Sequence, residues 1–208
     1  MQPLPPPAGY NANCRLGHLH LPKGGCLNRT DACTTGTVQV PMCLAPYLSE
    51  HISHTIDRLG HWPDCEWLVK LWAADWIPSR FAREKRPVFV DVGANIGACT
   101  VELVTRLPFA RVIAFEPGPA NLHHLTRTLH MAAMFDQTLL RRVAVMPFAL
   151  GGQQSSGRLV TNGGMSYIDS GGNDGGGSVS AVKAAAAQVH IHTLDEILDA
   201  DAPVRLIK

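Results

Sequence analysis

Two acidic residues and two glycines stand in this sequence where together they could bind a nucleoside. Asp91, Gly93 and Gly97 follow one short apolar run, and Glu116 ends the next one. Glycine lets the backbone turn tightly and approach a ligand closely. A carboxylate at the end of the second strand of such a unit can accept hydrogen bonds from ribose hydroxyls. The spacing therefore predicts a nucleoside-binding site.

The charge of Asp91 selects between two kinds of nucleoside ligand. Dinucleotide sites usually read G-x-G-x-x-G and place a pyrophosphate at a helix N-terminus. Here an acid precedes the first glycine. A carboxylate disfavours pyrophosphate and suits positive charge, such as the ammonium and sulfonium of S-adenosylmethionine. A helix cap is the alternative interpretation of Asp91, and an exposed strand-end acid that of Glu116, but their combined placement favours the cofactor.

Strands that alternate with helices must position these residues. Apolar runs at 88–90, 111–115 and 143–149 predict buried strands, and residues 99–107 and 121–134 carry apolar side chains at helical spacing. This alternation predicts right-handed crossovers and a parallel, doubly wound α/β sheet of the Rossmann-like type. Ligands bind such sheets at the carboxyl ends of the strands, where the acids and glycines lie.

A glycine-rich insertion at residues 151–188 interrupts this rhythm. A structureless connection of that length is unusual in a compact domain. We expect residues 158–160 and 166–168 to pair as a hairpin, with 169–180 as its tip. The pattern then resumes as a strand, a helical turn and a last strand, at 189–192, 194–198 and 204–208.

The chain divides into three parts. Residues 1–46 are rich in Pro, Gly, Thr and Cys and show no helix or strand periodicity, which predicts an irregular extension. Residues 47–86 are expected to be a helical lead-in, with an apolar stripe that faces the core and consists of Trp67, Leu68, Leu71 and Trp72. Residues 87–208 are expected to be the cofactor-binding domain.

Cysteines concentrate in the first part. Cys14, Cys26, Cys33 and Cys43 could form two disulfides in an oxidising compartment. Thiolates and imidazoles are also zinc ligands, and an alternative zinc site would use Cys14, His18, His20, Cys26 and Cys33. Because no paired Cys-x-x-Cys pattern occurs, we expect reduced or disulfide-linked cysteines and no metal.

The sequence gives opposing signals about the compartment. The cysteines and the glycosylation sequon at Asn28 favour a secretory route. The opening MQPLPPPAGY has neither the basic end nor the apolar stretch of a signal peptide, so the cytoplasm is the default.

Charge and hydropathy restrict the classes of partner. The 18 Lys and Arg nearly balance the 17 Asp and Glu, so no overall field attracts nucleic acid or an anionic membrane. The apolar runs are far shorter than the roughly 20 residues of a membrane-spanning helix. We therefore expect a small-molecule or glycan partner, no nucleic acid and no membrane span. The composition does not determine the oligomeric state.

Five segments between residues 87 and 208 match one family pattern. They read VFVDVGANIGACT, VIAFEPGPANLHHL, FALGG, HTLDEILDA and VRLIK. In these segments the sequence resembles the FkbM family of methyltransferases. The resemblance implies a class I methyltransferase fold and S-adenosylmethionine-dependent methylation, typically of a hydroxyl oxygen on a sugar or other small metabolite.

The same resemblance implies a set of cofactor-binding residues. The loop residues would line the methionine side, Glu116 would hold the ribose with Pro117 beside it, and the residues after the third strand would flank the adenine. The loop residues are Asp91, Gly93, Ala94, Asn95 and Gly97, and the adenine residues are Ala149 and Leu150.

No catalytic residue is predicted. In the family, the last strand continues into an acidic motif at the reactive end of the cofactor, and this sequence stops at Lys208. A general base would be expected in that motif. We therefore expect a C-terminally incomplete methyltransferase domain.

Two other functions stay open at this point. The chain could be an inactive cofactor-binding or interaction module whose open sheet edge recruits a partner strand. It could also be a nicotinamide-dependent oxidoreductase, an alternative that generic features of the fold alone support.

Overall fold

The computed structural model describes residues 1–8, 13–22, 37–46, 51–73, 87–107, 110–162, 165–169 and 187–208. The helices in these ranges are α1 (His51–Leu59), α2 (Pro63–Ala73), α4 (Ala98–Arg106), α5 (Pro119–Ala133), the 3-10 turn η1 (Leu139–Arg141) and α6 (Leu194–Ile197). The strands are β1 (Arg15–Pro22), β2 (Thr37–Leu44), β3 (Val88–Val92), β4 (Arg111–Phe115), β5 (Val143–Met146), β6 (Ala149–Leu150), β7 (Ser155–Asn162), β8 (Met165–Asp169), β9 (Ala187–His192) and β10 (Val204–Ile207).

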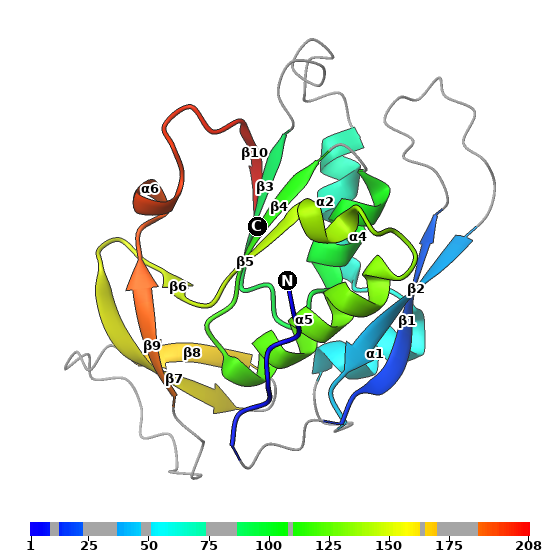
Figure 1. Ribbon diagram of the computed structural model, residues 1–208, viewed down its shortest axis with the longest axis horizontal. Helices are drawn as coiled ribbons and strands as arrows, with labels where there is room; N and C mark the ends of the chain where they lie inside the picture. Colours follow the sequence, from blue (N-terminus) through cyan, green and yellow to red (C-terminus); the bar gives the residue numbers. More distant parts are fainter. Residues whose placement is uncertain are drawn as a thin grey trace.

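A four-stranded sheet lies at the centre of the molecule, in the order β10-β3-β4-β5 (Figure 1). Every pairing in it is parallel. The predicted parallel α/β sheet is therefore confirmed. The chain moves outward from β3 to β4 and β5 and returns on the other side of β3 as β10, so the strand order reverses beside β3. Such reversals are the places where open α/β sheets bind ligands.

The two faces of this sheet have different covers. Phe89, Val112 and Ala114 belong to a buried core that includes α4 and α5, which lie together on one side of the sheet (Figure 1). On the other face, Val90 and Phe115 form a second, smaller cluster. Partly buried residues of the α6 region, such as Ile197, pack against that cluster. Among the described residues, the helix that packs on this second face is thus the four-residue α6.

Two strands lie in the first part of the chain, where an irregular extension was expected. β1 and β2 form an antiparallel pair in unbroken register from Arg15 with Leu44 to Pro22 with Thr37. Leu19 and Met42 are fully buried in the same core as α4 and α5. Our expectation of an irregular extension was therefore wrong over these strands, because the pair obtains its apolar partner from the distant α5.

Two disulfides join segments far apart in the sequence. Cys14 pairs with Cys43, and Cys65 on α2 pairs with Cys99 on α4. The sequence predicted disulfides but not the second pair. With Cys14 bonded to Cys43, the alternative zinc site loses a thiolate ligand, and Cys26 lies outside the described residues, as does Cys33. Disulfides by themselves do not decide the compartment.

The orientation of α2 differs from the prediction. Cys65 is fully buried and Leu68 packs against the core, whereas Trp67 and Leu71 are exposed. The disulfide to Cys99 holds the Cys65 face of the helix inward. The prediction that the stripe faces the core is therefore right for Leu68 and wrong for Trp67 and Leu71. None of the helices in the described ranges has the length and apolar character of a membrane span.

The glycine-rich insertion contains the predicted hairpin. β7 and β8 pair antiparallel, with Leu159 opposite Ile168. They belong to a second sheet of order β6-β9-β7-β8, which stands beside the carboxyl ends of the central strands. The predicted hairpin tip falls mostly outside the described residues. The second sheet thus borders the space at the carboxyl ends of the central strands on one side.

We expect Arg142 to stabilise the end of α4. It is buried, and its guanidinium donates to the carbonyls of Val104 and Leu107 at 2.6 and 3.3 Å. Arg142→Met leaves these carbonyls without that donor and should lower the free energy of unfolding by about 2–3 kcal/mol in urea denaturation. The exposed Arg111→Met is the control and should change it by less than about 0.5 kcal/mol. Equal effects would contradict this role.

Candidate functional site

The loop between β3 and α4 has an unusual backbone. Gly93, Asn95 and Gly97 all have positive φ, of 71°, 53° and 93°. Asparagine tolerates this region better than most side chains, and the Asn95 Oδ1 accepts a hydrogen bond from the amide of Ile96 at 2.8 Å. The amides of Gly93 and Ala94 donate to the Phe115 carbonyl at 2.9 and 3.0 Å. The loop is therefore tied to the end of β4.

Glu116 joins this loop to the next one. Its Oε2 accepts the amide of Asn95 at 2.8 Å, while its Oε1 accepts the amide of Gly118 at 2.8 Å and the side-chain amide of Asn121 at 3.3 Å. The residue is only 3% exposed. Burial raises the pKa of the Glu116 carboxyl above its ordinary value of 4.5, and these hydrogen bonds oppose the rise.

Asp91 lies behind the loop. Its carboxylate accepts the Thr100 hydroxyl at 2.6 Å and the Lys208 ammonium at 2.9 Å, and its side chain is fully buried. Lys208 also donates to the Gly93 carbonyl at 3.3 Å. The charge of Asp91 is thus compensated within the chain, which the sequence argument did not foresee.

A cavity of about 460 Å³ opens in front of the loop, at the carboxyl ends of β3 and β4. This volume lies within the range of roughly 300–1,000 Å³ that is common for small-molecule sites. The predicted residues that line the cavity are Gly93, Asn95, Glu116, Pro117, Ala149 and Leu150. The fold therefore brings together residues from three separate segments of the predicted set.

The other predicted residues lie around this cavity without lining it. Ala94 borders a narrow neighbouring cavity of about 30 Å³ together with Lys208. Gly97 faces α5, and a methyl group added to it would lie 2.5 Å from Cδ1 of Leu125. Gly97 thus allows α4 and α5 to approach closely, and Asp91 supports the loop from behind.

Sequence reasoning missed much of the apolar lining. These residues are Ile52, Val92, Phe115, Phe148, Leu159 and Ile168, with Asn121 as a polar addition. Asn121 lies in the first turn of α5, and its side chain contacts the predicted Glu116. Its closeness to Glu116 in the sequence is the one feature that could have predicted a place in the site. Ile52 and Ile168 come from α1 and β8, and no local pattern links either residue to the glycine loop.

A second cavity, of about 410 Å³, lies at the other end of the central sheet. Val88, Arg111 and Pro203, near the amino ends of the strands, line it. Because α/β sheets bind ligands at the carboxyl ends of their strands, the cavity beside Glu116 is the better candidate.

Comparisons with known proteins add little to this geometry. No protein-family model matches the chain, and no curated protein matches it. Among solved structures, the chain is similar to the crystal structure of methyltransferase FkbM from Methylobacillus flagellatus KT, with 16% sequence identity and a TM-score of 0.36. The alignment covers 75% of this chain and 36% of that one. A likeness this weak carries no argument about the fold or the function of this chain.

The two loop glycines should differ in their tolerance of alanine. Gly93→Ala adds a methyl group with no atom within 4 Å, so it should cost only the strain of positive φ, about 1–2 kcal/mol. Gly97→Ala adds the contact with Leu125 and should cost about 1–3 kcal/mol more. Urea denaturation of both variants measures the difference. Equal losses would show that the α4–α5 contact does not depend on Gly97.

Proposed function

We propose that this chain binds S-adenosylmethionine in the cavity beside Glu116 and is part of a methyltransferase that acts on a hydroxyl group of a sugar or other small metabolite. One observation carries the proposal. A buried carboxylate, held by backbone amides of two loops, borders a cavity whose lining is largely apolar. The class of acceptor comes from the sequence resemblance.

The hydrogen bonds of Glu116 leave capacity for a ribose. An ionised carboxylate has roughly four acceptor positions. Oε1 accepts hydrogen bonds from Gly118 and Asn121, and Oε2 accepts one from Asn95. Oε2 therefore keeps a position for one hydroxyl donor. The amides hold the carboxylate in place before a ligand arrives, which lowers the cost of ordering the site.

The polarity of the cavity favours an uncharged nucleoside over a pyrophosphate. Glu116 brings negative charge, and the described residues that line the cavity include neither lysine nor arginine. A pyrophosphate would face this carboxylate without a counter-charge. The apolar side chains of Leu150, Leu159 and Ile168 offer a surface on which an adenine could pack.

At the methionine end of the proposed ligand, Lys208 already occupies the acceptors that the sequence suggested for a ligand ammonium group. Asp91 and the Gly93 carbonyl form a pair of acceptors suited to an ammonium group, and the Lys208 ammonium uses both of them. Lys208 is partly exposed, with 28% of its side-chain surface accessible. A ligand ammonium would therefore compete with Lys208 for these acceptors.

The chain's own residues supply binding and orientation. S-adenosylmethionine, when bound, supplies a methyl group activated by its sulfonium. Glu116 would orient the ribose, the backbone of the glycine loop would lie beside the amino-acid part, and the apolar lining would exclude water. The acceptor hydroxyl must lose a proton, and we assign no described residue to that step.

Glu116→Gln should weaken adenosine binding about tenfold in calorimetric titration. A glutamine side chain has one acceptor oxygen, whereas the Glu116 carboxylate accepts through both of its oxygens. Its NH₂ group would therefore face the backbone amide of Asn95 or of Gly118, and two donors would meet. The loss should be much smaller with 2′,3′-dideoxyadenosine, which lacks the hydroxyls.

The adenosine affinity of the unaltered chain should fall as the pH is lowered, because protonation of the Glu116 carboxylate removes an acceptor for the ribose. Since burial raises the pKa of Glu116, this fall should begin at a higher pH than it would for an ordinary carboxyl group. Calorimetric titration over a series of pH values measures it.

Glu196→Gln is the matched control, since Glu196 is an exposed acid in the α6 capping box and does not line the cavity. It should leave both affinities unchanged. If Glu116→Gln lost the same affinity for adenosine and for the dideoxy ligand, Glu116 would not bind the ribose hydroxyls. Tight binding of a nicotinamide dinucleotide, with none of S-adenosylhomocysteine, would favour the oxidoreductase alternative.

Lys208→Met should strengthen the binding of S-adenosylhomocysteine several-fold and leave that of 5′-methylthioadenosine unchanged. The first ligand has an ammonium group that can replace the lysine at Asp91, and the second has none. Calorimetry with both ligands measures the difference. Thermal denaturation of the variant must accompany it, because the substitution also leaves the buried Asp91 without its cation.

Asp91→Asn combined with Lys208→Met removes both charges and serves as the control. This double variant should lose the preference for the ammonium ligand. If Lys208→Met weakened both ligands equally, Lys208 would be a structural support of the loop and the ammonium would bind elsewhere.

A further inference from the structure

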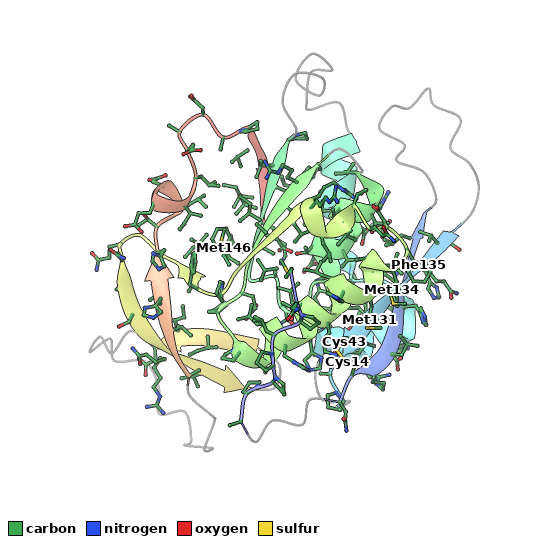
Figure 2. All side chains as sticks on the ribbon, viewed as in Figure 1. Cys14, Cys43, Met131, Met134, Phe135 and Met146 are labelled. Carbon is green, nitrogen blue, oxygen red and sulfur yellow. A yellow bond between two sulfur atoms is a disulfide. The ribbon has the colours of Figure 1, made fainter. Side chains whose placement is uncertain are left out.

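We propose that the Cys14–Cys43 disulfide is a thiol–disulfide exchange site that reacts with a low-molecular-weight thiol and uses His124 as its proton donor. The proposal does not depend on the methyltransferase function. It begins from a contact that the candidate site does not use, on the far side of α5 from the central sheet. Figure 2 shows Cys14 and Cys43 next to each other beside this helix.

The disulfide and the histidine come from three different segments. Cys14 directly precedes β1, Cys43 lies in β2, and His124 lies in the middle of α5. The Nδ1 atom of His124 is 3.0 Å from the Cys43 sulfur. The sulfur atoms and a ring nitrogen all lie within 4.8 Å of one another. The amide of Cys43 donates to the Thr128 hydroxyl at 3.0 Å, which keeps β2 against the helix.

The two cysteines of this disulfide differ in exposure. Cys43 is fully buried, whereas Cys14 is half-buried at the start of its strand. In exchange, a thiolate attacks one sulfur and the other sulfur leaves with the bonding electron pair. Because Cys14 is the more exposed residue of the pair, the proposal assigns the attack of an external thiolate to its sulfur. Cys43, which is beside the imidazole, is therefore the leaving sulfur.

The contact with His124 lowers the barrier to this step. The incoming thiolate forms a bond to the Cys14 sulfur, the bond between the two cysteines breaks, and the Cys43 sulfur receives the electron pair. In the proposed step the imidazolium form of His124 gives its Nδ1 proton to that thiolate and becomes the neutral imidazole, and a proton from solvent regenerates the imidazolium. A second thiol attacks the mixed disulfide on Cys14 and releases the oxidised thiol, which leaves both cysteines reduced.

The second disulfide provides an internal comparison. Cys65 is fully buried and Cys99 is 3% exposed, so an external thiol has no comparable access to either sulfur. In the described part of the chain, the cluster of cysteine and histidine ligand atoms contains Cys14, Cys43 and His124 but neither of these two. The same protein thus contains one disulfide with an adjacent imidazole and one that serves as a buried cross-link.

The experiment follows both disulfides in the folded 208-residue chain. Cys26→Ser and Cys33→Ser are introduced so that the two disulfides contain the only remaining cysteines. The protein is incubated with glutathione and a metal chelator, then quenched with acid and alkylated, and its peptides are weighed by mass spectrometry. We expect Cys14–Cys43 to open first, with the trapped glutathione on Cys14.

Histidine variants test the proton donor. His124→Asn should slow the opening of Cys14–Cys43 by about tenfold or more, as expected for loss of a general acid. His123→Asn is the matched control: this neighbouring histidine contacts the Leu4 carbonyl at 2.8 Å and should leave the rate unchanged. Circular dichroism checks that each variant is folded.

Three results would overturn the proposal. Both disulfides could open together at the rate of global unfolding, the trapped glutathione could be on Cys43, or folded His124→Asn could react as fast as the unaltered chain. The first two are measured without a histidine variant, so the test does not depend on the folding of His124→Asn.

Discussion

The candidate site depends on the hydrogen bonds that the Glu116 carboxylate accepts from two backbone amides. The carboxylate lies at the end of β4 and accepts amides from the loop after β3 and from the turn before α5. Positive φ at Gly93 and Asn95 shapes the first of these loops, and the amides of Gly93 and Ala94 reach the Phe115 carbonyl. A buried charge is costly unless hydrogen bonds compensate it. Loop shape and carboxylate therefore support each other.

The rest of the fold keeps this carboxylate in place. α5 begins directly beside it, packs against α4 through Gly97, and presents its other side to β2. The Cys65–Cys99 disulfide joins α2 to the first turn of α4. The second sheet adds Leu159 and Ile168 to the cavity. One helix thus connects the cavity, the central sheet and the disulfide beside His124.

The Asp91–Lys208 pair shows where an argument from charge needs the structure. From sequence, Asp91 was a free carboxylate available to a cationic ligand. In the fold its side chain is fully buried, and Lys208, directly after the neighbouring strand β10, compensates its charge. Parallel pairing of β10 with β3 creates this contact between residues far apart in the chain. In the proposed site, a ligand ammonium would therefore compete with Lys208 for Asp91.

The sequence by itself determined the alternation of strands and helices, the glycine loop, the position of Glu116 and the hairpin in the insertion, because these depend on neighbours in the chain and on backbone preferences. Tertiary structure alone decided that β1 and β2 complete the core, that Trp67 faces outward, and that Ile52 reaches the cavity. It also decided the partners of the cysteines. Burial and pairing join distant segments, and local periodicity contains no information about which distant segment supplies the partner.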